Sequence, residues 1–270
     1  MSRSRSGMAE ADTAVLAGRL EAAWRERVPI APFSETGELT TVEDAYATQQ
    51  AWAALRAAEG ETRIGRKIGL TSRGMQRQMG VAEPDFGDLW SSRRFDDCVF
   101  PSDVFIQPRV EGEVALLIGA DLQGPGVSPT DVRAAARAAA LAIEVVDSRI
   151  KEWRIALVDT IADNASYGGF ACGAWSEQLL GADLPSVRFT LSRNGQDVVQ
   201  ETGAAVLGSP LSAVAWLVNK LAEFGDGVRS GDVVLSGSFG GAVRAAAGDE
   251  FSLRCAGEEP VSVRFTEVAR

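Results

Sequence analysis

The sequence predicts an α+β protein in which a helical N-terminal cap covers a larger core of mixed β-structure. Residues 9–27 and 41–60 carry apolar side chains at helical spacing. From about residue 64 the chain changes to short apolar runs bounded by turn-forming residues, which are typical of strands. We therefore expect a disordered leader at 1–8, a helical cap at 9–62 and a mixed-β core at 63–270, the last two of which can count as one domain.

Helix signals recur later in the chain. Ser128 followed by Pro129 and Asp131 has the pattern of a capped helix start, and the alanine-rich run behind it favours helix to about residue 140. Ser72 as a cap and Gly80 as a closing glycine favour a second, shorter helix at 72–79. The helices expected beyond the cap are 72–79, 128–140 and 210–224.

Short apolar runs predict the strands of the core. Residues 110–118 are the strongest candidate, and Asn194-Gly195 predicts a hairpin between its flanking strands. The polar stretches 81–90 and 159–169 are expected to be loops. The remaining strands are expected at 64–70, 99–100, 104–106, 142–146, 186–193, 197–205, 231–238, 250–255 and 261–266.

The composition excludes several classes of protein. The net charge is −10, whereas nucleic acids and anionic membranes bind basic surfaces. Apolar runs such as 114–120 are too short to span a bilayer, and the first residues lack the apolar core of a signal peptide. Three widely spaced cysteines without a Cys-x-x-Cys pair are typical of buried thiols inside the cell. We expect a cytoplasmic protein that binds neither nucleic acid nor membrane.

The chain contains no histidine. Ser-His-Asp and Cys-His catalysis, histidine zinc sites and imidazole bases are therefore excluded. Any chemistry must use carboxylates, lysine, tyrosine, hydroxyls, thiols, backbone groups or a metal. Lysine is rare, with three among 27 basic residues, so Lys67 in a glycine-flanked apolar stretch is a candidate functional residue.

Three glutamates interrupt apolar segments. Glu111 and Glu113 would project from the same side of a strand, about 7 Å apart. A bound dication would relieve their repulsion and the cost of burying Glu144, and three carboxylates with water suit magnesium or manganese. The alternatives are ordinary acids on a solvent-facing edge strand and, for Glu144, a salt bridge with Arg149 or Arg109.

Lys67 and Asp85 are the candidate acid and base. Burial and a nearby metal would tune the charge of Lys67, and the proline before Asp85 would fix its loop. As alternatives, Lys67 pairs with an acid and Asp85 is a turn residue. The stretches 159–169 and 231–241 can present backbone N–H groups to a carboxylate or be plain turns, and neither matches a P-loop or a Gly-x-Gly-x-x-Gly motif.

In their order, these motifs resemble those of the 2-keto-4-pentenoate hydratases of aromatic meta-cleavage pathways, within the fumarylacetoacetate hydrolase superfamily. The resemblance covers roughly residues 40–266. It rests on Gly-Arg-Lys-Ile-Gly-Leu-Thr-Ser at 65–72, Glu-Pro-Asp-Phe-Gly at 83–87, Arg-Val-Glu-Gly-Glu at 109–113, Glu-Val-Val-Asp-Ser-Arg-Ile at 144–150, Ala-Asp-Asn-Ala-Ser at 162–166 and Gly-Asp-Val-Val-Leu-Ser-Gly-Ser at 231–238.

The resemblance implies a β-roll core, a magnesium or manganese ion, a small 2-oxoacid substrate and a homo-oligomer. It implies metal binding by Glu111, Glu113 and Glu144, and acid/base roles for Lys67 and Asp85. It places in the substrate pocket Leu70, Ser72, Ser166, Tyr167, Ser236 and Ser238. The family often has a second serine where Tyr167 stands, so the tyrosine is expected to narrow or polarise the pocket.

The resemblance implies hydration of a 2-hydroxy-2,4-dienoate to a 4-hydroxy-2-oxoacid. The C–C bond hydrolases of the superfamily activate water with a histidine-containing dyad, which this chain cannot form. Three alternatives stay open: a 4-oxalocrotonate-type decarboxylase, an isomerase or tailoring enzyme on the same fold, and a non-catalytic 2-oxoacid-binding protein.

Overall fold

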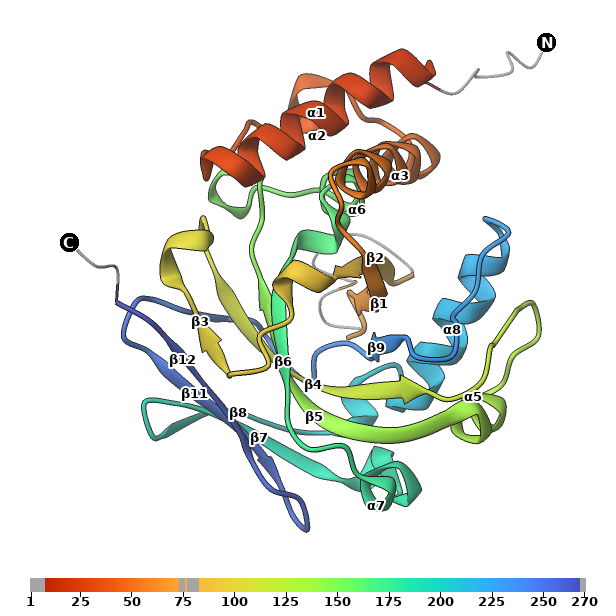
Figure 1. Ribbon diagram of the computed structural model, residues 1–270, viewed down its shortest axis with the longest axis vertical. Helices are drawn as coiled ribbons and strands as arrows, with labels where there is room; N and C mark the ends of the chain where they lie inside the picture. The colour runs from red at the N-terminus through yellow and green to blue at the C-terminus, as the bar shows by residue number, and fades with distance from the viewer. Residues whose placement is uncertain (1–7, 73–75, 77–82, 268–270) are drawn as a thin grey trace.

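The computed structural model describes residues 8–72, 76 and 83–267, which form two β-sheets beneath a layer of helices (Figure 1). The helices are α1 (Glu10–Glu26), α2 (Phe33–Thr36), α3 (Val42–Ala58), α5 (Pro129–Ala135), α6 (Leu157–Ala162), α7 (Glu177–Gly181) and α8 (Pro210–Ala222). The strands are β1 (Arg63–Gly69), β2 (Asp85–Trp90), β3 (Val99–Phe100), β4 (Arg109–Ile118), β5 (Ala136–Val146), β6 (Tyr167–Cys172), β7 (Arg188–Arg193), β8 (Gln196–Thr202), β9 (Val233–Leu235), β10 (Val243–Arg244), β11 (Glu250–Cys255) and β12 (Val261–Phe265).

The larger sheet has the strand order β2-β1-β9-β4-β5-β6, and β10 also pairs with β4. The long antiparallel pair β4–β5 forms its centre, while β9 runs parallel to β1 and antiparallel to β4. Nearly every residue of β4 and β5 is buried, as expected for a sheet that is covered on both faces. Motifs that lie far apart in the sequence thus meet on adjacent strands.

The smaller sheet has the order β3-β12-β11-β7-β8 and packs against the larger one. At Gly112 of β4, a Cβ atom would lie 2.8 Å from Cδ1 of Leu253 in β11, so glycine allows the two sheets to approach closely. The hairpin β7–β8 turns at Asn194-Gly195, where both residues have positive φ, as predicted.

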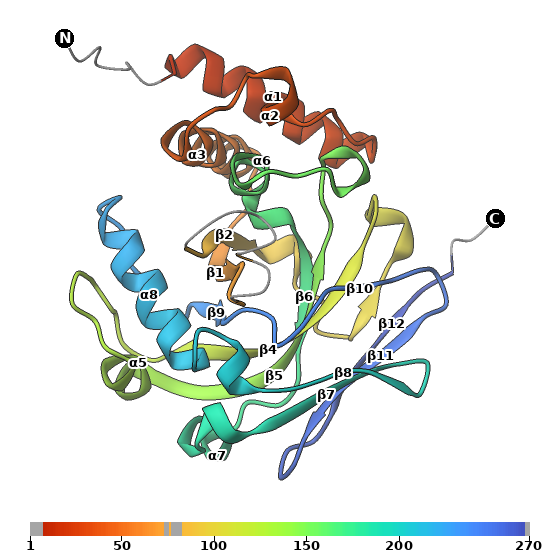
Figure 2. The same ribbon diagram turned by 180° about the vertical axis from the view of Figure 1, so that it is seen from behind.

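The N-terminal helices form a cap over one end of the larger sheet. Both views show α1 and α3 together above α6 (Figures 1 and 2). Trp24 of α1, Trp52 of α3 and Trp90 of β2 pack edge to face, with ring centroids 5.1–6.0 Å apart. Such aromatic pairs bury large apolar areas, so this cluster fixes the cap to the sheet.

Helix α8 lies in the apolar core. The segment Gly203–Ala222 is long and apolar enough to cross a membrane by length and composition. Eight of the thirteen residues of α8 are nevertheless buried in the folded chain, which is typical of a core helix.

The expectation of a loop at 81–90 is wrong, because β2 occupies Asp85–Trp90 and pairs with β1. All six residues of β2 are buried, so no alternation of polar and apolar residues marks the strand. Its two aspartates are held by other segments, since Asp88 forms an ion pair with Arg66 and Asp85 lies in the cavity described below.

The expectation of a helix through the alanine-rich run to residue 140 is also wrong. The capping box of Ser128 and Asp131 is present, but α5 ends at Ala135 and β5 begins at Ala136. Alanine favours helix locally. Here, however, the alanine-rich strand β5 pairs with β4 along its length, and most of its residues are buried. Tertiary packing therefore overrides the local preference.

Two smaller expectations are wrong as well. Residues 159–169 form the end of α6, a 3₁₀ turn (Asn164–Ser166) and the start of β6 rather than a loop. No strand forms at 104–106, because Ser102–Val104 is a 3₁₀ turn and the N–H of Ile106 donates to Asp147. The helix expected at 72–79 lies mainly outside the described residues.

The close pairing of β1 with β9 gives a stability prediction. A Cβ atom at Gly65 would lie 1.8 Å from the carbonyl oxygen of Val233, so Gly65→Ala should cost about 1–3 kcal/mol of unfolding free energy. Gly18→Ala in α1 meets no atom within 4 Å and should stabilise by about 0.5–1 kcal/mol. Urea unfolding of both variants measures the difference. Equal midpoints for the two variants would contradict the packing described for β1 and β9.

Candidate active site

Glu111, Glu113 and Glu144 project from neighbouring strands onto one face of the larger sheet. Glu111 and Glu113 are two residues apart on β4, and the register places Glu144 of β5 directly opposite Glu111. Each residue offers a carboxylate oxygen within 4.8 Å of the others. Glu113 and Glu144 are fully buried, and Glu111 is 9% exposed. The register of β4 and β5 thus gathers the three carboxylates.

Several of these carboxylate oxygens lack a hydrogen-bond donor. Glu113 accepts one bond from the N–H of Gly237 (2.7 Å), but its other oxygen accepts none among the described residues. Glu144 forms an ion pair with Lys67 (3.3 Å), and neither of its oxygens accepts a hydrogen bond from the described residues. Burial and the charge of Glu144 raise the pKa of Glu111 to about 7 and raise that of Glu113 well above its ordinary value. Buried, under-satisfied oxygen ligands of this kind fit a hard divalent cation.

Lys67 reaches this cluster from β1. Its side chain is 3% exposed, and its Nζ donates to the carbonyl oxygen of Ala165 at 2.9 Å. Burial lowers the pKa of Lys67, but the surrounding carboxylates, Glu144 first, outweigh burial and raise it. The ammonium is therefore charged when it faces the glutamates.

Asp85 lies beside Lys67 at the end of β2. It is opposite Gly69 of β1, where a Cβ atom would lie 2.1 Å from its Oδ1, so glycine leaves room for the carboxyl group. Oδ2 accepts from the hydroxyl of Thr160 (3.2 Å), whereas buried Oδ1 has no hydrogen-bond partner among the described residues. Burial raises the pKa of Asp85 against the attraction of Lys67. A carboxyl group whose pKa is raised in this way holds a proton more readily than an exposed aspartate and can return it.

The carbonyl group that faces Lys67 belongs to a strained turn. Asn164, Ala165 and Ser166 have φ of 53°, 50° and 54°, a left-handed conformation that side chains disfavour by about 1–2 kcal/mol per residue. The side chain of Asn164 offsets this cost by hydrogen-bonding both the N–H and the carbonyl oxygen of Asp88 in β2. The turn thereby directs the Ala165 carbonyl group at Lys67.

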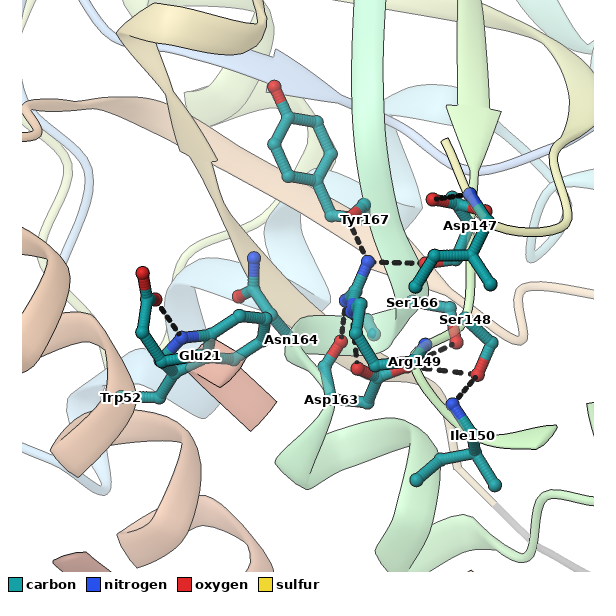
Figure 3. A network of polar contacts seen from close by, with 12 residues as sticks. Glu21, Trp52, Asp147, Ser148, Arg149, Ile150, Asp163, Asn164, Ser166 and Tyr167 are labelled. Atoms are coloured by element: carbon teal, nitrogen blue, oxygen red, sulfur yellow. Dashed lines mark hydrogen bonds and ion pairs between the residues drawn. The ribbon is translucent and has the colours of Figure 1, made fainter. Parts of the chain in front are cut away.

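A buried ion pair supports the same turn from below (Figure 3). Nε of Arg149 donates to Asp163 at 2.6 Å, and its guanidinium group lies over the rings of Trp24 and Trp52. Burial raises the pKa of Asp163 to about 6 against the pull of Arg149. Asp163 also accepts from the hydroxyl of Ser166 at 3.4 Å. Arg149 thus pairs with Asp163 and not with Glu144, which excludes one of the salt bridges considered above.

Some of these groups line one cavity of about 460 Å³, whereas Glu113 and Glu144 are not among its lining residues. Its charged end contains Lys67, Asp85 and Glu111, and its other walls are Gly69, Leu70, Arg109, Val146, Glu152, Trp153, Ile155, Thr160, Ala165, Ser166, Gly241 and Ala242. The guanidinium carbon of Arg109 lies 4.4 Å from the ring centroid of Trp153. Five non-glycine residues of the wall have positive φ: Leu70, Glu152, Trp153, Ala165 and Ser166. Backbone strain of this kind is common at functional sites.

The structure places only some of the other residues predicted to bind substrate at this cavity. Leu70 and Ser166 line it. Ser72 lines a neighbouring groove that shares Gly241 with the cavity, and Ser238 donates to the carbonyl oxygen of Gly240. Ser236 is fully buried, and its hydroxyl has no partner among the described residues.

Tyr167 does not line the cavity. Its side chain is fully buried, packs edge-on against Trp90 and donates towards the backbone carbonyl groups of Trp90 and Arg93. Figure 3 shows its hydroxyl pointing away from the Arg149 network. Of the expectation that this tyrosine narrows or polarises the pocket, the narrowing is wrong, because β6 directs the side chain into the aromatic core beneath the cap.

Reasoning from the sequence missed several residues of the site. Thr160 and the Ala165 carbonyl group contact Asp85 and Lys67 through tertiary structure that no local pattern reveals. Trp153 and Ile155 form part of the wall. The sequence indicated a place at the site for these two residues only through their position just after the motif at 144–150.

Comparison with known proteins identifies the family to which this site belongs. Residues 92–265 match the fumarylacetoacetate (FAA) hydrolase C-terminal family. A 2-hydroxyhexa-2,4-dienoate hydratase of Comamonas testosteroni is 44% identical over 252 residues, which cover 92% of this chain and 96% of that protein. A 2-keto-4-pentenoate hydratase of Burkholderia vietnamiensis is 41% identical over 258 residues, 94% of this chain and 97% of that protein.

A solved structure has nearly the same fold. It is a 4-oxalocrotonate decarboxylase from Pseudomonas putida G7, complexed with magnesium and adipate, with a TM-score of 0.92, 33% identity and coverage of 97% of this chain and 100% of that one. This chain belongs to the fumarylacetoacetate hydrolase family and, within it, to the group of the 2-keto-4-pentenoate hydratases, which are hydro-lyases.

Proposed function

We propose that the chain is a metal-dependent hydratase that adds water to a 2-hydroxy-2,4-dienoate and forms a 4-hydroxy-2-oxoacid. The observation that carries this proposal is the cluster of three buried glutamates beside Lys67, in which Glu113 and Glu144 have oxygens without a hydrogen-bond partner among the described residues. Lys67, Asp85 and Glu111 line the adjoining cavity. The hydratases that cover nearly the whole chain at 41–44% identity support the choice of reaction.

Glu111, Glu113 and Glu144 would hold the ion, and we propose magnesium or manganese, because the donor atoms are all carboxylate oxygens. When bound, such an ion supplies Lewis-acid stabilisation of negative charge on the oxygen at C2 of a 2-oxoacid. The magnesium in the solved decarboxylase is consistent with this choice.

Lys67 and Asp85 would move the protons. Conversion of the dienol to the 2-oxo-3-enoate takes a proton from the C2 hydroxyl and places one on C5. Addition of water then forms a bond from the water oxygen to C4, while C3 gains a proton. Each step needs one group that accepts a proton and one that returns it, and the raised pKa of Asp85 suits it to both. The charged Lys67 is the complementary donor, and the two roles can be exchanged.

A decarboxylase is the second candidate, because the solved 4-oxalocrotonate decarboxylase shares the fold at a TM-score of 0.92. It would release CO₂ from a dioate instead of adding water. Its 33% identity is below that of the hydratases, so we favour hydration.

Proton NMR of the purified protein with Mg²⁺ and 2-hydroxypenta-2,4-dienoate tests the proposed reaction. We expect a new signal from the C4 carbinol proton. Glu113→Gln should lower turnover by more than about 100-fold, since loss of outer-sphere partners of a metal alone costs about 10–100-fold. Glu250→Gln, an exposed strand glutamate, is the matched control and should retain activity. Full activity of Glu113→Gln, or release of CO₂ from a dioate without hydration, would refute the scheme.

Thermal unfolding at different pH values tests the metal site without turnover. The folded pKa of Glu111, about 7, lies above its ordinary value of 4.5, so the metal-free folded state binds protons more tightly than the unfolded chain. The stability that this protonation contributes is present below pH 4.5 and is lost as the pH rises to 7.

Added Mn²⁺ competes with these protons, so it should raise the melting temperature more at pH 7.5 than at pH 5. Glu111→Gln should weaken both the pH dependence and the response to Mn²⁺. An equal response of the wild-type protein at the two pH values would show that the ion binds elsewhere.

A further inference from the structure

Gln49 is a buried amide in α3, far in sequence from every residue of the cavity. Its side chain is 4% exposed. Its Nε2 donates two hydrogen bonds, one to the carbonyl oxygen of Phe86 (2.9 Å) and one to that of Ile161 (2.8 Å). A side-chain amide nitrogen has two hydrogens, so both donors are used.

The two carbonyl groups belong to the segments that carry Asp85 and its hydrogen-bond partner. Phe86 follows Asp85 in β2, and Ile161 follows Thr160 in α6. The hydroxyl of Thr160 donates to Asp85 at 3.2 Å. One amide therefore joins the strand that presents the carboxyl group to the helix that supplies its donor.

Both carbonyl groups lie where a regular hydrogen-bonding pattern ends. β2 is the edge strand of the larger sheet, so one of its sides has no neighbouring strand. Along β2, Gln49 bonds Phe86 and Asn164 bonds Asp88, two residues further on, which is the spacing at which a neighbouring strand would bond. The carbonyl group of Ile161 is among the last four of α6, where the N–H of the cap residue Asp163 also points to it, and Gln49 adds a second donor.

We propose that Gln49 is a positioning residue for Asp85, and that the N-terminal cap is thereby part of the catalytic apparatus. Gln49 touches no reacting atom. It fixes the distance between β2 and α6, and so the orientation of the Asp85 carboxyl group towards Lys67 and the cavity. This inference rests on the proposed role of Asp85 in proton transfer.

Gln49→Met keeps the length of the side chain and removes both donors. Displacement of a catalytic group by about 1 Å can cost 10²-fold in rate, so we expect kcat to fall by about 10- to 100-fold. The glutamates and the cavity wall are untouched, so KM and the dissociation constant for Mn²⁺ should stay within about twofold of wild type. A rise in KM or weaker Mn²⁺ binding with unchanged kcat would overturn the proposal.

Thr48→Val is the matched control. Thr48 is the adjacent residue in α3 and is fully buried, and its hydroxyl donates to the carbonyl oxygen of Asp44 within the same helix. The substitution removes a buried hydrogen bond from the cap without touching β2 or α6. It should leave kcat within about twofold of wild type, whereas an equal loss of kcat in both variants would reduce Gln49 to a structural role.

A double-mutant cycle with Thr160→Val tests whether Gln49 affects kcat through the hydrogen bond between Thr160 and Asp85. If Gln49 acts through the contact of Asp85 with Thr160, Gln49→Met should reduce kcat less in the Thr160→Val background than in wild type. Losses of kcat that simply multiply would argue against this route. Gln49→Leu also removes both donors without burying a charge and serves in the same cycle if Gln49→Met does not fold.

A structural measurement separates this inference from the proposed reaction. If the wild-type protein hydrates no dienoate, the proposed function fails. A crystal structure of Gln49→Met then still tests whether Gln49 positions Asp85 relative to Thr160. We expect Asp85 and Thr160 to move apart in that structure. A separation unchanged from 3.2 Å would overturn the positioning role.

Discussion

The concentration of negative charge in the interior is the constraint on which the rest of this structure depends. Four buried carboxyl groups, those of Asp85, Glu111, Glu113 and Glu144, surround one buried ammonium group, that of Lys67. Burying charges without partners costs several kcal/mol each, and one lysine cannot balance four acids. Without a cation the protein must hold protons there, as the raised pKa values show. A divalent ion would bring the net charge of the site close to zero. The ion proposed for catalysis would therefore also stabilise the site.

Regular paired strands carry the glutamates, and strained turns form part of the cavity wall beside them. The glutamates stand on the paired strands β4 and β5, whose register fixes their separation. Part of the cavity wall is the left-handed turn Asn164–Ser166, which the Asn164 side chain and the ion pair of Arg149 with Asp163 hold in place. Arg149 in turn lies against the tryptophans of the cap. The cap is therefore connected to the site by direct contacts and does more than cover the sheet.

Much of this arrangement could be predicted from the sequence. The cap helices, strand β4, the hairpin at Asn194-Gly195 and helix α8 follow from periodicity and turn chemistry, and the structure confirms them. The cluster of Glu111, Glu113 and Glu144 followed from carboxylates placed in apolar strands, together with the family resemblance.

What could not be predicted depends on contacts between distant segments. β2 lacks alternation because Asp88 pairs with Arg66 and Asp85 lines the cavity. The alanines of β5 form a strand because β4 pairs with them. Tyr167 follows a pocket serine in the sequence, but its side chain lies in the aromatic core. Local pattern does not encode such partners, so these assignments required the fold.

The most direct test of the metal site is anomalous X-ray diffraction from crystals of the protein grown with Mn²⁺. The account predicts one strong anomalous peak bounded by carboxylate oxygens of Glu111, Glu113 and Glu144, and its loss in Glu113→Gln. A peak at another site, or none at a saturating Mn²⁺ concentration, would contradict the claim that these buried glutamates form a metal centre.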